Sequence, residues 1–251
     1  MQKIRFFLIS AILFTAGFFN SCGKNNYEVM VVGVNTENFN EIDILVNALE
    51  NKKAERIGGV NLYSGKISNK NVAIVEAPVG MGDSAMATTI GINRFHPKNV
   101  ISEGTSGGHH DDVHINDILL AQNIIDTSSY RGDGSDPSSW ELMQPTLHSD
   151  ETLLKIARNV PNEYGALRKN GTIASGNCWN KGVDFINKLH EKFNEDCEEM
   201  ECYSVTNVCG YHSIPALSIK VISNNLITDE EYTQEAGKNI QRYVLNVIKA
   251  I

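Results

Sequence analysis

Short apolar runs alternate with helical patterns from residue 28 to the end of the chain. The runs with the length and composition of buried strands lie at 28–33, 60–67, 72–76, 100–103, 118–125, 171–175 and 216–222. Helical spacing predicts helices over 41–49, 84–95 and 151–159, from about 181, from about 201, and over 230–250. No internal repeat or low-complexity linker interrupts this alternation, which predicts a single α/β domain.

The start of the chain has the pattern of a secretory signal peptide over residues 1–21. A basic beginning precedes an apolar stretch at 6–19 that is too short for an ordinary membrane span. Cys22 follows a small residue at the end of this stretch, which resembles a bacterial lipoprotein lipobox, where the cysteine is acylated and becomes the mature N-terminus. The alternative is an ordinary signal peptide with an incidental cysteine. Both interpretations predict export, and the lipid implies a membrane-anchored protein of the cell envelope, on the periplasmic face.

The mature chain then consists of a short tether at 22–27 and one domain at 28–251, long enough for a substantial core. The full chain has a net charge of −8, and removal of Lys3 and Arg5 with the signal leaves −10. An acidic body without a basic run is a poor nucleic-acid binder. Small neutral or cationic substrates fit it better than polyanions.

Cysteine and histidine positions give no metal-site pattern. The cysteines after the predicted signal are Cys178, Cys197, Cys202 and Cys209. They lack zinc-type spacing, so buried free thiols are expected rather than a disulfide. The histidines at 109, 110 and 114 form no complete ligand set and are expected on a surface loop. We therefore expect neither a metal nor another cofactor.

Two polar residues stand at the ends of predicted elements. Glu201 opens a helical pattern, and Asn224 follows the strand predicted at 216–222. Open α/β sheets bind ligands beyond the carboxyl ends of their strands, so both side chains are expected at one crevice. Glycine turns are predicted at 80–82 and 104–108, where backbone amides can approach a ligand. The first turn lacks the third glycine and the later acidic residue of a dinucleotide-binding fingerprint.

A polar segment rich in Ser, Asp and Gly separates Ile125 from His148. Two interpretations stay open for it. It is either a surface excursion, or a loop over the pocket or at a subunit contact.

Taken together, these segments resemble the nucleoside phosphorylase superfamily, and most of all its 5′-methylthioadenosine/S-adenosylhomocysteine nucleosidase branch. After a first strand that ends at Gly33, the resemblance is carried by the segments at 57–65, 78–82, 96–101, 103–108, 116–119, 174–177, 199–201 and 221–224. It covers essentially the whole mature chain. It implies a central mixed, twisted β-sheet flanked by helices, a small purine nucleoside as substrate, and a homodimer.

The resemblance assigns the sugar and the attacking water to glutamates. Met200 and Glu201 match the pair that holds the ribose, with Glu199 beside them. An anion there stabilises the oxocarbenium-like transition state of N-glycosidic cleavage. Glu41 matches the glutamate that activates water, and Glu37 competes with it because several residues are inserted before Glu41. Each acid has an alternative role as a simple helix-start carboxylate.

The resemblance places further residues around the base and sugar. Trp179 matches the aromatic residue that stacks on the purine, and an indole face suits a heterocycle. Thr105 matches a hydroxyl residue near the sugar and the nucleophile. Gly80 and Ser223 lie in matching segments and are predicted to bind substrate as well. A core tryptophan is the alternative for Trp179, although its polar neighbours favour a loop.

Asn224 departs from the nucleosidase pattern. The nucleosidases have an aspartate there, which donates a proton to purine N7, and an amide cannot supply that proton. The 6-oxopurine phosphorylases of the superfamily use asparagine to pair with the oxo group and N7. Asn224 therefore favours hypoxanthine or guanine nucleosides, or else weakened catalysis, with a catalytically silent nucleoside-binding lipoprotein as the limiting case.

The charge near the first strand weighs against phosphate as co-substrate. Hexameric phosphorylases have a Gly-Asp-Pro-x-Arg turn after that strand and an arginine before the central glycine segment. At the matching positions, 33–37 and 101–103, this chain has Glu37 and Glu103 and no arginine. Negative charge repels phosphate, so hydrolysis is predicted in preference to phosphorolysis.

Overall fold

The computed structural model describes residues 27–37 and 39–251. The predicted signal peptide, Cys22 and nearly all of the predicted tether lie outside the described residues. Among the helices within these ranges, none combines the length and apolar character of a membrane span.

The described chain alternates strands and helices as the sequence predicts. The strands are β1 (Val29–Val34), β2 (Glu50–Ile57), β3 (Val60–Ile67), β4 (Lys70–Ala77), β5 (Asn99–Gly108), β6 (Ile118–Asp126), β7 (Tyr130–Arg131), β8 (Glu141–Leu142), β9 (Leu147–His148), β10 (Leu167–Ser175), β11 (Cys197–Glu199) and β12 (Ala216–Asn225). The helices are α1 (Asp43–Asn47), α2 (Met81–Phe95), α3 (Glu151–Ala157), α4 (Val183–Phe193), α5 (Cys202–Tyr211), α6 (Gln234–Ala250) and the short 3-10 helix η1 (Pro137–Ser139).

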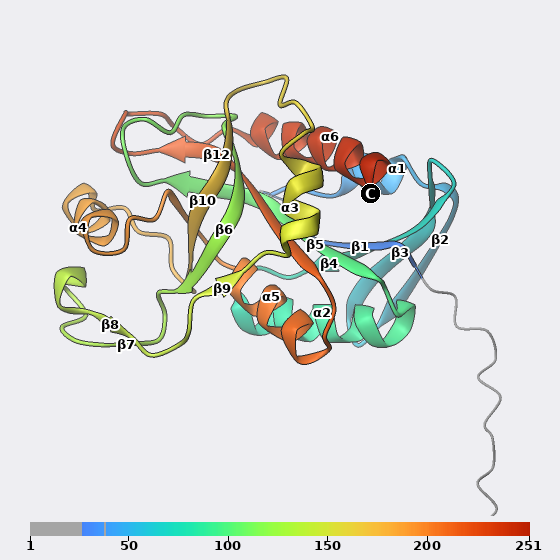
Figure 1. Cartoon of the computed structure of the whole chain (residues 1–251), viewed down its shortest axis with the longest axis horizontal. Helices are drawn as coiled ribbons and strands as arrows, with labels where there is room; N and C mark the ends of the chain where they lie inside the picture. Colours follow the sequence, from blue (N-terminus) through green and yellow to red (C-terminus); the bar gives the residue numbers. More distant parts are fainter. Residues whose placement is uncertain (1–26, 38) are drawn as a thin grey trace, which may run out of the picture.

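One mixed sheet of ten strands forms the centre of the fold, which confirms the expected architecture (Figure 1). Its order is β11-β10-β6-β12-β5-β1-β4-β3-β2, with β9 added on β6. β1 runs parallel to β4 and β5, whereas β12 runs antiparallel to β6. β11 also pairs with β5 in antiparallel fashion, so five strands, β5, β12, β6, β10 and β11, form a closed circuit of pairings.

Helices cover both faces of the sheet, with α6 on one side and α2 and α5 on the other (Figure 1). The central strand β1 is buried throughout, and its side chains alternate between two clusters. Val29 and Val31 pack in the cluster that includes α6, and Met30 and Val32 in the cluster that includes α2. Burial on both faces is typical of a parallel central strand and explains its uninterrupted apolar sequence.

Parallel pairing of β5 with β12 brings two predicted site segments together. The register places Thr105 opposite Val221 and Gly107 opposite Asn224, with an irregularity between Ile222 and Asn224. The antiparallel pairing of β11 with β5 brings Glu198 opposite Gly107. The same end of the sheet therefore receives β5, β12 and the start of α5.

The sequence prediction was wrong in the region that follows β1. The predicted helix at 41–49 is only the five-residue α1, and the edge strand β2 begins at Glu50. Nearly all of β2 is exposed, so its sequence shows no apolar alternation. It is held instead by backbone pairing with β3, and a pattern of side chains cannot reveal such a strand.

The glycine-rich segment at 104–108 is also not a turn, because β5 continues through Gly108. Similarly, β12 extends to Asn225, so Asn224 lies within the strand rather than after it. Gly104 has a φ of +152°, and a Cβ there would lie 2.6 Å from Glu41 Oε2 and 2.8 Å from Lys220 Nζ. The glycine thus leaves room for two charged side chains beside the strand.

The polar segment between β6 and α3 forms the β7–β8 ribbon and η1. Trp140 is buried there, stacks on Tyr130 and donates from Nε1 to the Asp133 carbonyl. η1 packs against α4. The segment supplies no lining residue to the pocket described below.

Candidate active site

A pocket lies at the end of the sheet where β5, β12 and the start of α5 meet. The predicted site residues that line it are Glu41, Thr105, Trp179, Glu199, Met200, Glu201, Ser223 and Asn224. Its other lining residues are Val34, Phe39, Val79, Ser106, Gly107, Cys178, Glu198 and Tyr232. No lysine or arginine of the described chain is among them. The pocket is thus bounded by carboxylates, small polar groups and aromatic rings.

Glu201 is turned inward, although it stands at the start of α5 as predicted. It is 8% exposed, its Oε1 accepts a hydrogen bond from the Gly80 N–H at 3.1 Å, and its Oε2 lies 3.3 Å from Lys220 Nζ. Burial raises the pKa of Glu201 to about 7, with Glu199 adding to the rise and Lys220 opposing it. Glu201 is therefore an acid that titrates close to neutral pH inside the pocket.

Glu199, rather than Glu201, satisfies the start of α5. Its Oε2 accepts from the backbone N–H groups of Glu201 and Cys202, both at 2.9 Å, and its Oε1 accepts from the Ser175 hydroxyl. Burial by itself raises the pKa of Glu199, but Lys220 and these hydrogen bonds outweigh burial and hold the pKa below its usual value. The helix-start role that was an alternative for Glu201 is therefore filled by Glu199.

Lys220 is the site residue that the sequence analysis missed. It is fully buried in the middle of β12, and its Nζ lies 3.0 Å from Glu199 Oε2 and 3.3 Å from Glu201 Oε2. Burial lowers the pKa of Lys220, but the surrounding carboxylates reverse this and raise it well above its usual value. Its signal was present as a lone lysine within an otherwise apolar strand, because a buried charge requires a partner.

Glu41 also lines the pocket, and its Oε2 and Lys220 Nζ both lie close to Gly104. Its Oε1 accepts from the Thr105 backbone N–H at 2.8 Å and from the Thr105 hydroxyl at 2.7 Å. Burial raises the pKa of Glu41, while Lys220 and Thr105 act in the other direction. The competing Glu37 is exposed and does not line the pocket. The geometry therefore favours Glu41 as the acid that faces a bound ligand.

Glu103 is a second buried carboxyl close to Glu41. It packs against Gly33, where a Cβ would lie 2.3 Å from Glu103 Oε1. Neither of its oxygens has a hydrogen-bond partner among the described residues. Burial, together with the charge of Glu41, raises the pKa of Glu103 well above its usual value. Burial and the nearby Glu41 charge therefore disfavour the ionised form of Glu103.

The outer end of the pocket is aromatic and more open. Trp179 is 46% exposed on the loop between β10 and α4, so it is not a core tryptophan. Its ring centroid lies 6.4 Å from that of Tyr232, which in turn lies 5.8 Å from Phe39. Lys181 Nζ lies 5.2 Å over the Trp179 ring. Such a group of rings suits a flat heterocycle.

The prediction that the cysteine thiols are buried was wrong for one residue, which lies on the loop between β10 and α4. Cys178 is exposed, whereas Cys197, Cys202 and Cys209 are buried, and all four are free. The pocket loop leaves the first thiol at the surface, while the others lie on β11 and α5 against the sheet.

Asn224 and Ser223 line the pocket from β12. The Ser223 hydroxyl donates to the Ser106 carbonyl at 3.1 Å, which ties β12 to β5. The Asn224 amide lies beside Gly107, 3.5 Å from the position of a Cβ there. Gly80 lies behind Glu201 rather than along the pocket, because its N–H is taken by the Glu201 carboxylate. Its contribution is therefore to hold Glu201.

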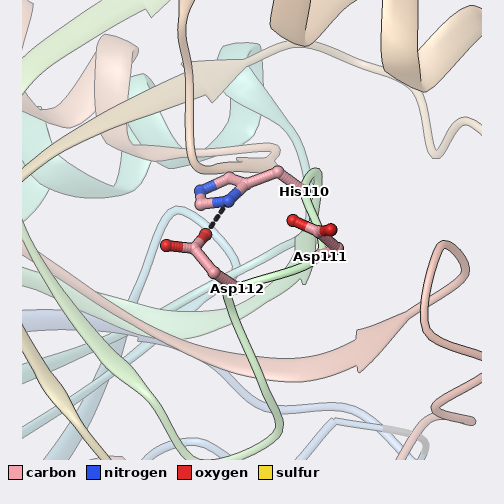
Figure 2. Close-up of side chains that lie close together, drawn as sticks. All are labelled: His110, Asp111 and Asp112. Carbon is pink, nitrogen blue, oxygen red and sulfur yellow. Dashed lines mark ion pairs between the residues drawn. The ribbon is translucent and has the colours of Figure 1, made fainter.

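Only one group of side chains in the described ranges brings at least three metal-type ligand atoms within 4.8 Å of one another, namely His110, Asp111 and Asp112 (Figure 2). Figure 2 shows the His110 ring directed at the Asp112 carboxylate. The other ring nitrogen, Nε2, lies 3.1 Å from Asp196 Oδ1. Arg168 also approaches Asp112. His110 and Asp112 thus have ionic partners within the protein.

The expectation of a surface loop for the three histidines was wrong for His109. That residue is 1% exposed, because its backbone follows β5 into the protein and its ring lies between two carboxylates, Glu195 and Glu198. His110 is half-buried, and His114 is the more exposed.

Comparisons with known proteins agree with this architecture. The family model described as the phosphorylase superfamily matches residues 29–251. A 5′-methylthioadenosine/S-adenosylhomocysteine nucleosidase of Oceanobacillus iheyensis is 24% identical over 88% of this chain and 100% of the relative. The solved nucleosidase of Neisseria meningitidis, in complex with methylthio-immucillin-A, superimposes with a TM-score of 0.76 at 23% identity over 90% of this chain and 100% of that one. A futalosine hydrolase mutant of Helicobacter pylori gives the same values. These structures share the fold.

Proposed function

Because the chain belongs to the phosphorylase superfamily, we propose that it hydrolyses the N-glycosidic bond of a purine nucleoside and releases free base and sugar. The observation that carries this proposal is the pair of inward-facing carboxylates, Glu201 and Glu41, in a pocket that no cationic side chain of the described residues lines. The relatives named above as nucleosidases and a futalosine hydrolase support the same reaction class.

Glu201 supplies the electrostatic part of the mechanism. As the bond between C1′ and N9 breaks, its electron pair leaves with the base, and positive charge develops on the ribose ring. A carboxylate beside the ring stabilises that charge more than it stabilises the neutral substrate. Lys220 and the Gly80 N–H fix the Glu201 carboxylate in place, so little reorganisation is needed during the reaction.

Glu41 serves as the general base in this proposal. A water molecule attacks C1′ as the base departs, and Glu41 accepts one proton from that water. The departing purine anion takes its proton from solvent, because Asn224 cannot supply one. Burial raises the pKa of Glu41, which strengthens it as a base, while Thr105 fixes its orientation with two hydrogen bonds. Thr105 and Glu41 thus act as one unit.

The charge of the groups around the pocket favours water over phosphate as the nucleophile. A phosphorylase must hold a dianion, which arginine and lysine do well. Here the nearest cation, Lys220, is engaged by Glu199 and Glu201 and lies behind the pocket wall. Phosphorolysis is the less favoured alternative.

Asn224 favours a 6-oxopurine base. The amide can donate one hydrogen bond and accept another, which matches an oxo group and N7, but it cannot transfer a proton. A catalytically silent nucleoside-binding protein is the second candidate, and the same observation favours it, because the leaving group then lacks a protein acid.

Export, acylation of Cys22 and a homodimer belong to the proposal as well. They are supported by the pattern of residues 1–22 and by the resemblance to the superfamily. Labelling with a radioactive fatty acid in a bacterial host tests the anchor, with Cys22→Ala as the control that should lose the label.

The experiment for the reaction uses the purified mature chain with inosine, guanosine, adenosine and methylthioadenosine, each with and without phosphate. Free base released without phosphate supports hydrolysis. Tight binding of a nucleoside with no product in any mixture supports the silent binding protein instead. Release of base only when phosphate is present would establish phosphorolysis.

A further inference from the structure

A buried histidine lies close to the aromatic end of the pocket but takes no part in the proposed chemistry. His109 Nδ1 lies 2.5 Å from Glu195 Oε1, and Nε2 lies 3.6 Å from Glu198 Oε1. The backbone N–H of His109 donates to the Asp196 carbonyl at 3.0 Å. Glu195 is fully buried, and its backbone carbonyl and carboxylate also face His190. The imidazole is thus hydrogen-bonded at Nδ1, whereas Nε2 faces the Glu198 carboxylate at ion-pair distance without a hydrogen-bond partner among the described residues.

Glu198 connects this histidine to the pocket loop. Its Oε1 accepts from the Asn180 backbone N–H and its Oε2 from the Asn180 side-chain amide, both at 2.6 Å. The carboxylate is buried and lines the pocket from β11. Two short hydrogen bonds to one residue restrict the backbone and the side chain of Asn180 together.

The loop held in this way carries Trp179. On the other side of the tryptophan, the Asn177 side chain accepts from the Met81 N–H at 2.8 Å, and the Gly176 N–H donates to the Glu199 carbonyl at 3.0 Å. Trp179 therefore lies between two anchored asparagines. Removal of the Glu198 contacts would leave the indole anchored on one side only.

We propose that His109, Glu198 and Asn180 form a brace that positions Trp179 as the stacking platform for the purine. The inference rests on the proposed function, since it takes the base end of the pocket from that proposal. None of the three brace residues is placed at the reacting atoms, so all three are positioning residues. We therefore expect disruption of the brace to weaken base binding more than it slows the chemical step.

The charge of His109 strengthens its contacts within the brace. Burial lowers the pKa of His109, but the hydrogen bond to Glu195 and the nearby charges of Glu195 and Glu198 outweigh it and raise the pKa to about 9. His109 is therefore protonated at neutral pH, and its charge lies between two buried carboxylates. Charge-assisted contacts of this kind are stronger than neutral ones.

The test of this proposal measures the mobility of the Trp179 ring. The chain has two tryptophans, and Trp140 lies outside the pocket, so Trp140→Phe leaves Trp179 as the sole indole reporter. In this background, Asn180→Ala removes one of the two bonds to Glu198. We expect a lower fluorescence anisotropy of Trp179, at least about fivefold weaker binding of hypoxanthine and adenine, and a larger change in KM than in kcat.

Asn159→Ala is the control, because Asn159 is an exposed asparagine whose side-chain amide donates to the Lys155 carbonyl, and it lies outside the pocket. Glu198→Gln is the second variant. It keeps the shape and one acceptor for Asn180, and we expect an intermediate effect. Anisotropy and base affinity in Asn180→Ala equal to those of Asn159→Ala would overturn the brace. The anisotropy is measured without turnover, so it decides the brace separately from the reaction assay that decides the proposed function.

Discussion

The two ends of the pocket are built in different ways. The end with Glu41, Glu199 and Glu201 is assembled on strands and at the start of a helix, and each of these carboxylates is buried and hydrogen-bonded to backbone or to Lys220. The other end places Trp179 on a loop, with nearly half of its surface exposed. The electrostatic field at the first end is therefore fixed. At the second end, the position of the Trp179 ring depends on hydrogen bonds made by neighbouring side chains.

This difference indicates a division of tasks. Stabilisation of a charge requires groups that are already oriented, since their reorganisation would cancel much of the gain. Recognition of a flat base depends on where the stacking ring lies, and the hydrogen bonds of Asn177 and Asn180 on either side of Trp179 hold that position. Substitutions at the first end should thus reduce kcat strongly, and substitutions at the second end should alter KM and substrate choice.

The largest effect is expected for Glu201→Gln. The amide keeps an acceptor for the Gly80 N–H but removes the charge, so kcat/KM for the preferred nucleoside should fall by about a thousandfold. The thermal midpoint should change little, because Glu199 still pairs with Lys220. Steady-state kinetics and a melting curve check both statements. Unchanged turnover would remove Glu201 from the mechanism.

Glu41→Gln should reduce kcat by about a hundredfold, because the attacking water loses its general base. Glu37→Gln is the matched control, since Glu37 is exposed and lies only four positions earlier. Its kcat should equal that of the parent enzyme. The reverse pattern, with the larger loss in Glu37→Gln, would reassign the base.

Protonated His109 should make stability depend on pH. Its folded pKa of about 9 is above its ordinary value of 6.5, so its stabilising contribution is complete below pH 6.5 and is lost as the pH rises through 9. We expect the free energy of unfolding of the parent to exceed that of His109→Gln by about 2 kcal/mol at pH 6. Urea titrations at several pH values should show the difference shrinking between about pH 6.5 and pH 9. A difference that does not vary with pH would contradict a charged His109.

The smallest effect is expected for Asn224→Asp. A carboxyl group at this position can protonate N7 of an adenine-type base, so the ratio of kcat/KM for adenosine to that for inosine should rise by about tenfold. Parallel assays of the two nucleosides measure the ratio. The same preference in parent and variant would count against Asn224 as the base-contacting residue.

Much of this site could be predicted because its residues carry strong local signals. The buried strand β1 is almost entirely apolar, β5 and β12 begin with short apolar runs, and Glu201 precedes a clear helical pattern. Lys220 was missed because strand patterns describe which residues are buried, not which charges they meet across the sheet. The brace was missed for the same reason, since His109 and Glu198 are joined only by the pairing of β5 with β11.

Errors in secondary structure arose where backbone pairing, not side-chain pattern, decides the element. β2 is polar and exposed, and the three-residue β11 is too short for any period to appear. The glycines at the end of β5 indicated a turn, but they are accommodated in the strand by pairing with β12 on one side and β11 on the other.

The most direct test of the central claim is the fate of oxygen in the sugar product. Turnover of a purine nucleoside in ¹⁸O-labelled water, with and without phosphate, followed by mass spectrometry, identifies the nucleophile. The account predicts one labelled oxygen on C1′ of the ribose and a rate that does not depend on phosphate. Formation of an unlabelled sugar phosphate, only when phosphate is present, would contradict it.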